Sequence, residues 1–412
     1  MYDVIFIGAG CANLPAAYWL HLNKPQTNFL LVDIGTNVTR RDHESPIDSM
    51  LGVSGAGLMS DGKFSFYSSG TNVWKLDKKK LKSSYNFMKD FLSEFSDEIP
   101  DFPEELDPDF VPQQNWTLKS YKSIYLSLEQ RIKLAIKISV DYYDEPNNRF
   151  KLNTEVVDII KSANFYILKC RNVKDGTLSE ISTKKIVCGG GRFMPLFLRK
   201  ISFIPNEFRR IELGCRFEGD KDNALYNLSS NIDPKFMKYD ADKKIEYRLF
   251  CFCKQGQTVL TDFNGIKTWS GRSDCLPTSK SNFGFNLRFK DPKYIPLLET
   301  ALKIKPFIID FDELKKKNIK VEDKLKECYG DFSSYFLDGL KSFMSFNNID
   351  DINNINGFKL FGPSIEGLSM YPITDDHLKV PNEQIWISGD CCGKFRGIIA
   401  SMLSGIFIAQ DL

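Results

Sequence analysis

Residues 1–20 read MYDVIFIGAGCANLPAAYWL, and a second apolar stretch, FLLVDIG, follows at residues 29–35. The first run of strand-forming residues ends at Gly8, and Gly10 follows, so the backbone can turn tightly and approach a phosphate. The helix expected next presents free N–H groups and the positive end of its dipole to that phosphate. Asp33 closes the second strand, where a carboxylate accepts ribose hydroxyls and repels a 2′-phosphate. This layout predicts a dinucleotide site that disfavours NADP.

The third glycine of this fingerprint is absent. Asn13 stands where a helix normally packs closely on its strand. Asn13 would either push the helix away from the strand or hydrogen-bond a phosphate oxygen through its amide. Taken alone, the motif leaves open a glycine-rich turn that holds no ligand.

Composition narrows the class of protein. The chain has 412 residues, of which 42% are hydrophobic, and this predicts two interleaved domains. Lys plus Arg number 55 against 53 Asp plus Glu, so the near-neutral charge gives no reason to expect nucleic acid or an anionic membrane as a partner. No apolar stretch reaches the roughly 20 residues that a membrane span needs, and the run IIASMLSGIFIA at 398–409 predicts a buried helix instead.

Cysteine and histidine usage points to a reducing compartment and away from metals. The ten cysteines show no framework of a small secreted fold, and no signal peptide is recognisable, so we expect a cytoplasmic protein. The three histidines, His21, His43 and His377, stand at no metal-ligand spacing. We therefore expect no metal site.

Further along the chain, several segments have a recognisable pattern. The glycine- and serine-rich stretch at 50–70 predicts a special loop that is neither strand nor helix. Residues 150–191 predict a β-meander that returns to a buried parallel strand at 185–188. Residues 211–219 and 246–271 alternate as strands with turns, and 291–346 carry mostly helical spacing. Residues 384–409 predict a buried strand, a glycine-acid turn and an apolar helix.

Six separate segments together resemble one family. It comprises the FAD-dependent dehydrogenase-like flavoproteins of the glutathione-reductase structural class, in particular the group labelled FAD-utilising dehydrogenases. The matching segments are GAGCANLPAA at 8–17, GVSGAGLMSDGKFSF at 52–66, CGGGR at 188–192, ELGCRFE at 212–218, RLFCFCKQGQ at 248–257 and GDCCGKFRGIIASMLSG at 389–405. Their order and spacing, more than any single segment, indicate the family.

The resemblance implies an α/β fold. A Rossmann-like FAD-binding domain, three-layered ββα with a β-meander, is expected from residues 1–75, 115–215 and 357–412. Residues 76–114 are expected to form a helical and acidic surface excursion, and 216–356 an interleaved α+β substrate domain.

The same resemblance implies FAD as cofactor. Gly8, Gly10 and Asn13 would cradle the pyrophosphate, and Asp33 would hold the adenosine ribose. Gly397 and Ile398 would open a helix whose N–H groups stabilise negative charge on the reduced flavin, aided by Arg396. The other expected cofactor positions are Cys11, which would pack beneath the cofactor, and Ala12, Ile34, Ser60, Asp61, Gly62, Lys63, Val156, Gly189, Gly190, Gly389 and Asp390.

The expected function is therefore that of an FAD-dependent oxidoreductase that transfers hydride between a small organic substrate and flavin N5. A second nucleotide fingerprint is absent from the sequence, so transient NAD(P)H or a redox partner protein remain alternative sources of electrons. Two other classes stay open, a non-redox binding protein on the same fold, similar to GDP-dissociation inhibitors, and a flavin-dependent RNA-modifying enzyme.

Catalytic candidates come from segments expected to border the cleft. Cationic or phenolic groups there would orient an acidic substrate, and the nominees are Lys63, Arg192, Arg248, Arg272 and Tyr371. Cys251 and Cys253 alternate on a strand and so face the same way. A structural ion pair or hydrogen bond is an alternative role for each nominee.

Overall fold

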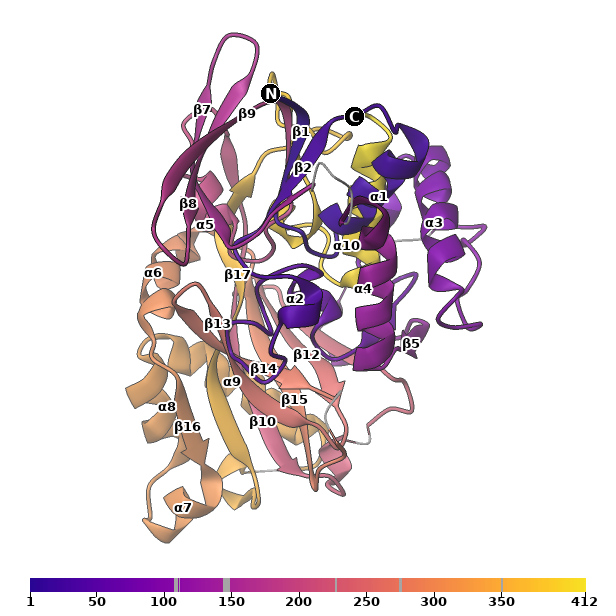
Figure 1. Ribbon diagram of the computed structural model, residues 1–412. Helices are drawn as coiled ribbons and strands as arrows, with labels where there is room; N and C mark the ends of the chain where they lie inside the picture. The colour runs from indigo at the N-terminus through magenta and orange to yellow at the C-terminus, as the bar shows by residue number, and fades with distance from the viewer. Residues whose placement is uncertain (107–109, 111, 144–148, 227, 274–275, 350) are drawn as a thin grey trace. The chain divides into compact units, whose positions relative to one another are not determined.

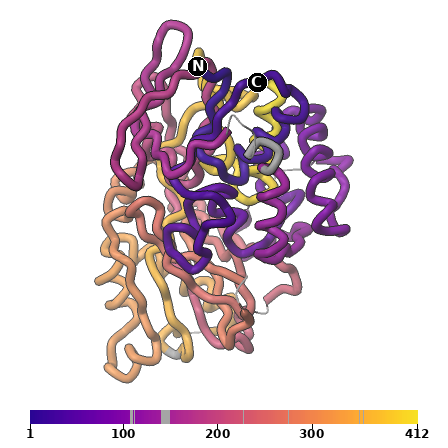
Figure 2. Tube along the Cα trace, in the orientation of Figure 1, coloured from indigo at the N-terminus to yellow at the C-terminus, as the bar shows by residue number. Residues whose placement is uncertain are grey.

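A computed structural model describes the chain apart from residues 107–109, 111, 144–148, 227, 274–275 and 350 (Figures 1 and 2). It has an α/β fold, with one mixed and one antiparallel sheet of seven strands each. The chain divides into two compact units. Unit 1 comprises residues 1–109, 121–207 and 370–412, and unit 2 comprises residues 110–120 and 208–369. Residues 76–109 thus belong to unit 1, and the insertion at 110–120 belongs to unit 2.

Unit 1 is built on a seven-stranded sheet of order β6-β2-β1-β9-β8-β7, with β18 paired to β9. The parallel strands are β1 (Tyr2–Ile7), β2 (Phe29–Val32), β6 (Phe150–Lys151), β9 (Leu178–Cys188) and β18 (Ile385–Ile387). The antiparallel members are β7 (Thr154–Lys161) and β8 (Tyr166–Asn172). The pairings confirm the predicted meander and its parallel return strand at 185–188. The return strand could be predicted because a buried parallel strand is a continuous apolar run in the sequence.

Helices cover this sheet. They are α1 (Asn13–Asn23), α3 (Lys78–Leu92), α4 (Leu128–Tyr143), α5 (Pro195–Leu198) and α10 (Ile398–Ala409). Figure 1 shows indigo α1 beside yellow α10, and a Cβ on Gly405 would stand 1.8 Å from the carbonyl oxygen of Ala12. Because Gly405 has no side chain, the backbone of α10 can approach the backbone of Ala12 at the start of α1. Helix α10, predicted as buried, is buried along almost its whole length.

The glycine-rich stretch at 50–70 corrects one expectation. It contains a single turn of helix, α2 (Gly55–Leu58), and a strand, β3 (Lys63–Ser65), which pairs with β5 (Ser123–Tyr125). The segment was expected to hold neither, because glycines and serines favour loops when read locally. Ser54 and Gly55 adopt positive φ of 78° and 65°, and this turn starts the helix.

Unit 2 holds a second seven-stranded sheet, of order β16-β17-β10-β15-β12-β11-β4. Its strands are β4 (Thr117–Lys119), β10 (Asn206–Asp220), β11 (Lys235–Asp240), β12 (Ile245–Cys253), β15 (Lys280–Phe289), β16 (Phe307–Asp310) and β17 (Lys359–Pro372). A separate hairpin joins β13 (Gln257–Phe263) and β14 (Ile266–Arg272). The helices are α6 (Ile295–Lys303), α7 (Phe311–Lys316), α8 (Val321–Tyr329) and α9 (Phe332–Phe346), as the helical spacing at 291–346 predicts.

The two faces of this sheet differ in chemistry. One face is aromatic: Phe285 stacks edge-on against Phe336 of α9, and Phe283 meets Phe343. The opposite face carries buried charged side chains on β10 and β12, which alternate along these strands with apolar and aromatic ones. Within the described ranges, no helix is both long and apolar enough to span a bilayer.

Candidate functional site: the first glycine turn of unit 1

The turn after β1 lies between two other backbone segments of unit 1. Gly8 has φ +89°, and a Cβ there would stand 2.9 Å from the carbonyl oxygen of Gly189. On the other side, a Cβ on Gly55 would stand 2.8 Å from the Cα of Gly10. Gly8 and Gly55 are therefore required by contact of backbone with backbone inside the unit. Gly389 also approaches this turn, since a Cβ there would stand 3.2 Å from the Cβ of Ala12.

Helix α1 begins without a capping side chain. Ala12 is its N-cap residue, and no acidic residue stands in the first turn. An uncapped helix start favours a negatively charged group near its N–H donors. The thiol of neighbouring Cys11 donates to the carbonyl oxygen of Ser54 at 3.5 Å. Burial raises the pKa of Cys11 to about 11, so the thiol stays protonated at neutral pH and packs as a small apolar group.

Asp33 follows β2 and is only 6% exposed. Its Oδ2 accepts from the backbone N–H of Ala9 at 2.7 Å, and its Oδ1 accepts from that of Gly35 at 2.8 Å. Burial raises the pKa of Asp33, whereas these hydrogen bonds and the positive charge of Arg41 oppose that rise. Each carboxylate oxygen keeps further acceptor capacity, so the group can still accept from a ribose hydroxyl.

Arg41 is the residue that sequence reasoning missed at this turn. Its guanidinium donates to the carbonyl oxygens of Asp48, Val53 and Gly55 at 2.6, 2.8 and 3.1 Å and to Ser54 Oγ at 3.1 Å. Its Nη2 is buried and has no hydrogen-bond partner among the residues that the structure describes. Burial lowers the pKa of Arg41 to about 10, so it stays charged at neutral pH. A buried cationic N–H in this state fits an acceptor supplied by a ligand.

A second buried arginine holds the end of the same loop. Arg131 of α4 is fully buried, and its Nη1 donates to the carbonyl oxygens of Leu58 and Ser60 at 2.7 and 3.1 Å. Arg41 and Arg131 together fix the backbone from residue 53 to residue 60. Sequence reasoning gave no signal for either residue, because a single arginine in a polar loop or an amphipathic helix is ordinary.

Asn13 is a buried hub and has no exposed surface. Its Nδ2 donates to the carbonyl oxygens of Ile7, Gly8 and Val187 at 3.0, 2.8 and 3.3 Å. Its Oδ1 accepts from Ser388 Oγ at 2.8 Å. The amide thus ties the ends of β1, β9 and β18 together, and it is engaged with backbone rather than open to a phosphate. Gly189 makes room for it, since a Cβ there would stand 2.5 Å from the Asn13 side chain.

The loop at 60–63 is also tied internally. Ser60 Oγ donates to the carbonyl oxygen of Gly57 at 2.8 Å, and Lys63 Nζ lies 3.2 Å from Asp61 Oδ2. Gly62 has φ +73°, and a Cβ there would stand 2.5 Å from the carbonyl oxygen of Leu126. The Lys63 ammonium, at the start of β3, thus forms an ion pair with the Asp61 carboxylate.

The C-terminal turn holds four more of the predicted residues. Arg396 Nη2 and Nε lie 3.1 and 3.2 Å from Asp390 Oδ2, so the guanidinium forms an ion pair with the predicted ribityl-binding acid. Gly397, with φ +106°, is the N-cap of α10 and provides no side-chain cap, and Ile398 is the first helical residue. Apart from the two chain neighbours of Gly397, no atom among the described residues lies within 4 Å of a Cβ built there, so the start of α10 is open at this point. This matches the helix predicted to begin at Ile398.

The remaining expected cofactor positions lie on strands of the unit 1 sheet or directly after them. Val156 is buried in β7 at a register shift, and Ile34 is partly exposed after β2. Gly190 follows β9, and a Cβ there would stand 2.7 Å from Met194 Sδ.

The catalytic nominees are divided between the units. Lys63, Arg192 and Tyr371 belong to unit 1, and Arg248 and Arg272 belong to unit 2. Tyr371 is buried, and a Cβ on Gly393 would stand 2.7 Å from its ring. Within unit 2, Arg248 is buried, and its guanidinium lies 3.4 Å from Glu212 Oε1 and 3.2 Å from Glu246 Oε1.

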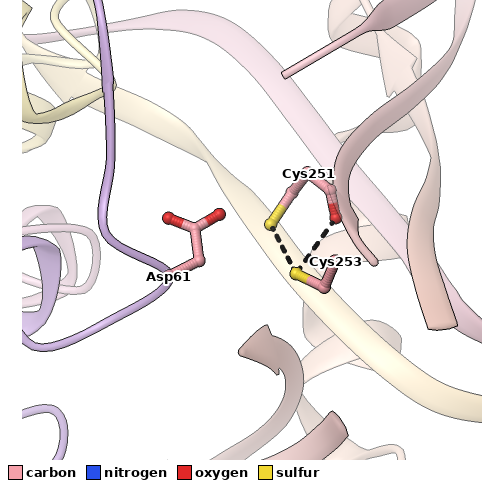
Figure 3. Close-up of side chains that lie close together, drawn as sticks. All are labelled: Asp61, Cys251 and Cys253. Atoms are coloured by element: carbon pink, nitrogen blue, oxygen red, sulfur yellow. Dashed lines mark hydrogen bonds between the residues drawn. The ribbon is translucent and has the colours of Figure 1, made fainter. Parts of the chain in front are cut away.

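The two cysteines of β12 do face the same way. Figure 3 shows the thiols of Cys251 and Cys253 turned toward each other, and the sulfur atoms lie 3.8 Å apart. Arg216 Nη2 donates to the carbonyl oxygen of Cys251 at 2.9 Å and lies 3.6 Å from Cys253 Sγ.

No protein-family model matches this chain, and no curated protein matches its sequence. Solved structures resemble it only distantly. AlpK shares 11% identity with a TM-score of 0.42 over 100% of this chain, which spans 62% of AlpK. CtdE in complex with FAD shares 11% identity with a TM-score of 0.42 over 100% of this chain and 84% of CtdE. A flavoprotein/dehydrogenase from Cytophaga hutchinsonii shares 12% identity with a TM-score of 0.38 over 99% and 77% of the two chains. Similarity at this level says nothing of the chain's chemistry.

Proposed function

We propose that this chain is an FAD-dependent oxidoreductase that exchanges a hydride between a small organic substrate and the flavin. The observation that carries the proposal is the pair formed by Asp33 and Arg41 beside the first glycine turn. One is a buried carboxylate at the end of β2, and the other is a buried cation with an N–H that lacks a partner among the described residues. Together they offer an acceptor and a charged donor in front of an uncapped helix.

These groups suit the nucleotide half of FAD. The Asp33 carboxylate would accept from the ribose hydroxyls, and the N–H groups at the start of α1 would face the pyrophosphate. Arg41 would donate its remaining N–H to an anionic or ribose oxygen. Gly397 and the first turn of α10 would place a second uncapped helix start toward the flavin ring. Bound FAD would supply the two-electron hydride chemistry.

The test is a titration of the purified chain with FAD, in which the visible absorbance and the fluorescence of the flavin report binding. We expect saturable binding with a protein-bound flavin spectrum. Asp33→Asn is expected to weaken binding about tenfold or more, because it replaces an anionic acceptor at the ribose position. Asp42→Asn is the matched control, since Asp42 is exposed in the loop that follows β2. A chain that stays colourless after incubation with excess FAD and removal of the unbound FAD contradicts the proposal.

Anaerobic reduction separates the remaining classes. If the chain is an oxidoreductase, the visible absorbance of its bound flavin is expected to decrease on addition of NADH, NADPH or an organic donor. A non-redox binding protein on this fold would hold the flavin without turnover or would not bind it. An RNA-modifying enzyme would show salt-sensitive RNA binding, which the near-neutral net charge of +2 does not favour.

A further inference from the structure

Strand β12 of unit 2 ends in two cysteines, Cys251 and Cys253, that stand two residues apart. Such residues of a regular strand are about 6.4–6.8 Å apart along its axis, at the upper end of the Cα separation that a disulfide bridges. This strand is not regular, because its register with β15 shifts between Phe250 and Cys253, and Cys251 has φ +51°. The irregularity turns the two thiols toward each other, and their sulfur atoms lie 3.8 Å apart (Figure 3).

The two thiols differ in exposure. Cys251 is partly exposed, whereas Cys253 is fully buried. A thiol must be accessible to react with a molecule in solution, so Cys251 is the one that such a molecule reaches first. Cys253 is in contact with the sulfur of Cys251 and is therefore placed to react with whatever bond forms there.

A buried cation lies beside this pair. Arg216 of β10 is 2% exposed, and its Nη2 lies 3.6 Å from Cys253 Sγ. The same Nη2 donates to the carbonyl oxygen of Cys251 at 2.9 Å, and Arg216 Nε donates to Asn282 Oδ1 at 3.1 Å. These bonds hold the guanidinium in place. A positive charge at this distance stabilises negative charge on sulfur, and the thiolate is the form of cysteine that attacks a disulfide.

Other cysteines of the chain are in a different environment. Burial raises the pKa of Cys11 and Cys170 to about 11 and that of Cys188 to about 12, so these thiols stay protonated at neutral pH. They pack as small apolar groups. The pair on β12 instead combines an accessible sulfur, a second sulfur in contact with it and an adjacent guanidinium.

We propose that Cys251 and Cys253 form a redox-active dithiol that reacts reversibly with a low-molecular-weight disulfide. The Cys251 thiolate attacks one sulfur of the small disulfide, whose S–S bond breaks, and one small thiolate leaves with the electron pair. The Cys253 thiolate then attacks Cys251 Sγ, so that a bond forms between the two cysteines and the second small thiolate leaves. The two cysteines lose two electrons, the small disulfide gains them, and the two cysteine protons are balanced by those on the two released thiols.

The bridge is expected to be a reversible modification rather than a structural staple. Rotation about the side-chain bonds must bring the sulfur atoms from 3.8 Å to about 2.05 Å. The loop that the bridge closes contains a single residue, Phe252, so it constrains the unfolded chain little. Accessible disulfides exchange readily with small thiols, and Cys251 is accessible. This inference goes beyond the proposed function and concerns unit 2 alone.

The experiment uses the sequence around the pair. Trypsin cleaves after Arg248 and Lys254, so the peptide LFCFCK at 249–254 contains these two cysteines and no other. The full chain, as purified and folded, is incubated with excess oxidised glutathione, blocked with iodoacetamide, digested and analysed by mass spectrometry. We expect the peptide to carry no alkyl group and to be lighter than the dithiol peptide by two hydrogen atoms. Dithiothreitol added before the iodoacetamide should restore alkylation at both cysteines.

Two single variants separate the roles of the thiols. Cys253→Ser removes the second thiol, so Cys251 should accumulate as a mixed disulfide with glutathione. Cys251→Ser leaves the buried thiol alone, and the reaction of the peptide with glutathione should be lost. Cys328→Ser is the matched control, since Cys328 of α8 is also partly exposed, and this variant should form the bridge as the unmodified chain does.

Three results with the unmodified chain would overturn the inference. The peptide could remain alkylated at both cysteines, it could stop at a mixed disulfide with glutathione, or the bridge could form only after denaturant has unfolded the chain. None of these depends on whether a variant folds, and thermal unfolding verifies the folding of the three variants. Because the reaction involves no flavin, a negative result here with a positive FAD titration removes only this inference.

Discussion

The amide oxygen of Asn13 accepts a hydrogen bond from the hydroxyl of Ser388 at 2.8 Å, although 375 residues separate them in sequence. The bond joins the turn after the first strand of unit 1 to the turn after its last strand. Asn13 therefore occupies the position of the missing fingerprint glycine with a structural purpose, since its amide links three parallel strands at their carboxyl ends.

Replacing Asn13 is expected to destabilise unit 1 more than replacing its partner. Asn13→Ala removes the bonds to backbone carbonyls and leaves buried polar groups without a partner, at a cost of about 2 to 3 kcal/mol in the free energy of unfolding. Ser388→Ala removes one neutral hydrogen bond, which costs about 1 kcal/mol. Chemical denaturation of both single variants and the double variant measures this. A double-variant loss equal to the sum of the single losses would show that the two residues are not coupled.

Arg41 is expected to affect FAD binding through geometry as well as charge. Arg41→Lys keeps the positive charge but loses the planar set of donors that reaches Val53 and Gly55, so FAD affinity should fall about tenfold or more. Arg40→Lys is the control because Arg40 is exposed and adjacent. Fluorescence titration compares the two variants. Equal affinities would exclude Arg41 from the nucleotide site.

Gly57 and Cys11 are expected to be coupled through space. A Cβ on Gly57 would stand 2.6 Å from Cys11 Sγ, so Gly57→Ala overpacks the contact and should cost about 1 to 3 kcal/mol in the free energy of unfolding. Cys11→Ala removes the sulfur atom and makes room. The double variant should therefore lose less stability than Gly57→Ala alone. If Cys11→Ala gives no recovery, the strain lies in the backbone of α2 instead.

Lys119 of β4 and Lys235 of β11, which are directly opposite each other in the sheet of unit 2, predict how the free energy of unfolding changes with pH. The pKa values of Lys119 and Lys235 are lowered to about 8 and about 7, against about 10.4 in the unfolded chain. Between these values the unfolded state binds more protons, so the contribution of the pair to stability rises as pH increases from about 7 to about 10. Below about pH 7 both ammonium groups are charged in the folded state, and the pair then destabilises the fold by its full amount.

Denaturation of the full chain at about pH 6 and about pH 9 measures this difference. Lys235→Gln should reduce the pH dependence and raise stability at the lower pH, whereas Lys238→Gln on the opposite face should leave the dependence unchanged. An identical pH dependence in the Lys235→Gln variant would contradict the assignment.

The sheet of unit 1 could be predicted from sequence because burial on both faces produces unmistakable apolar runs. The strands that begin at Tyr2, Phe29 and Ile385 and the buried helix α10 follow directly from such runs. The helix turn at Gly55 could not be predicted, because glycine has little helix propensity and tertiary contacts determine its conformation.

The roles of individual site residues depend on partners distant in sequence. Asp33 and the glycine turn carry a recognisable spacing, so they could be nominated. Arg41 could not be distinguished from Arg40 because its burial depends on the path of residues 48–55. The lysine pair of unit 2 was equally hidden, since cross-strand register decides which side chains meet.

The pairing of β18 with β9 and the close fit of α10 on α1 determine the order in which the protein can assemble on the ribosome. Unit 1 lacks an edge strand and a covering helix until residues 385–409 have been synthesised, whereas the main segment of unit 2 is complete by residue 369. The N-terminal strands therefore keep apolar surface exposed while unit 2 is synthesised. We expect chaperones to bind the nascent chain mainly during this interval.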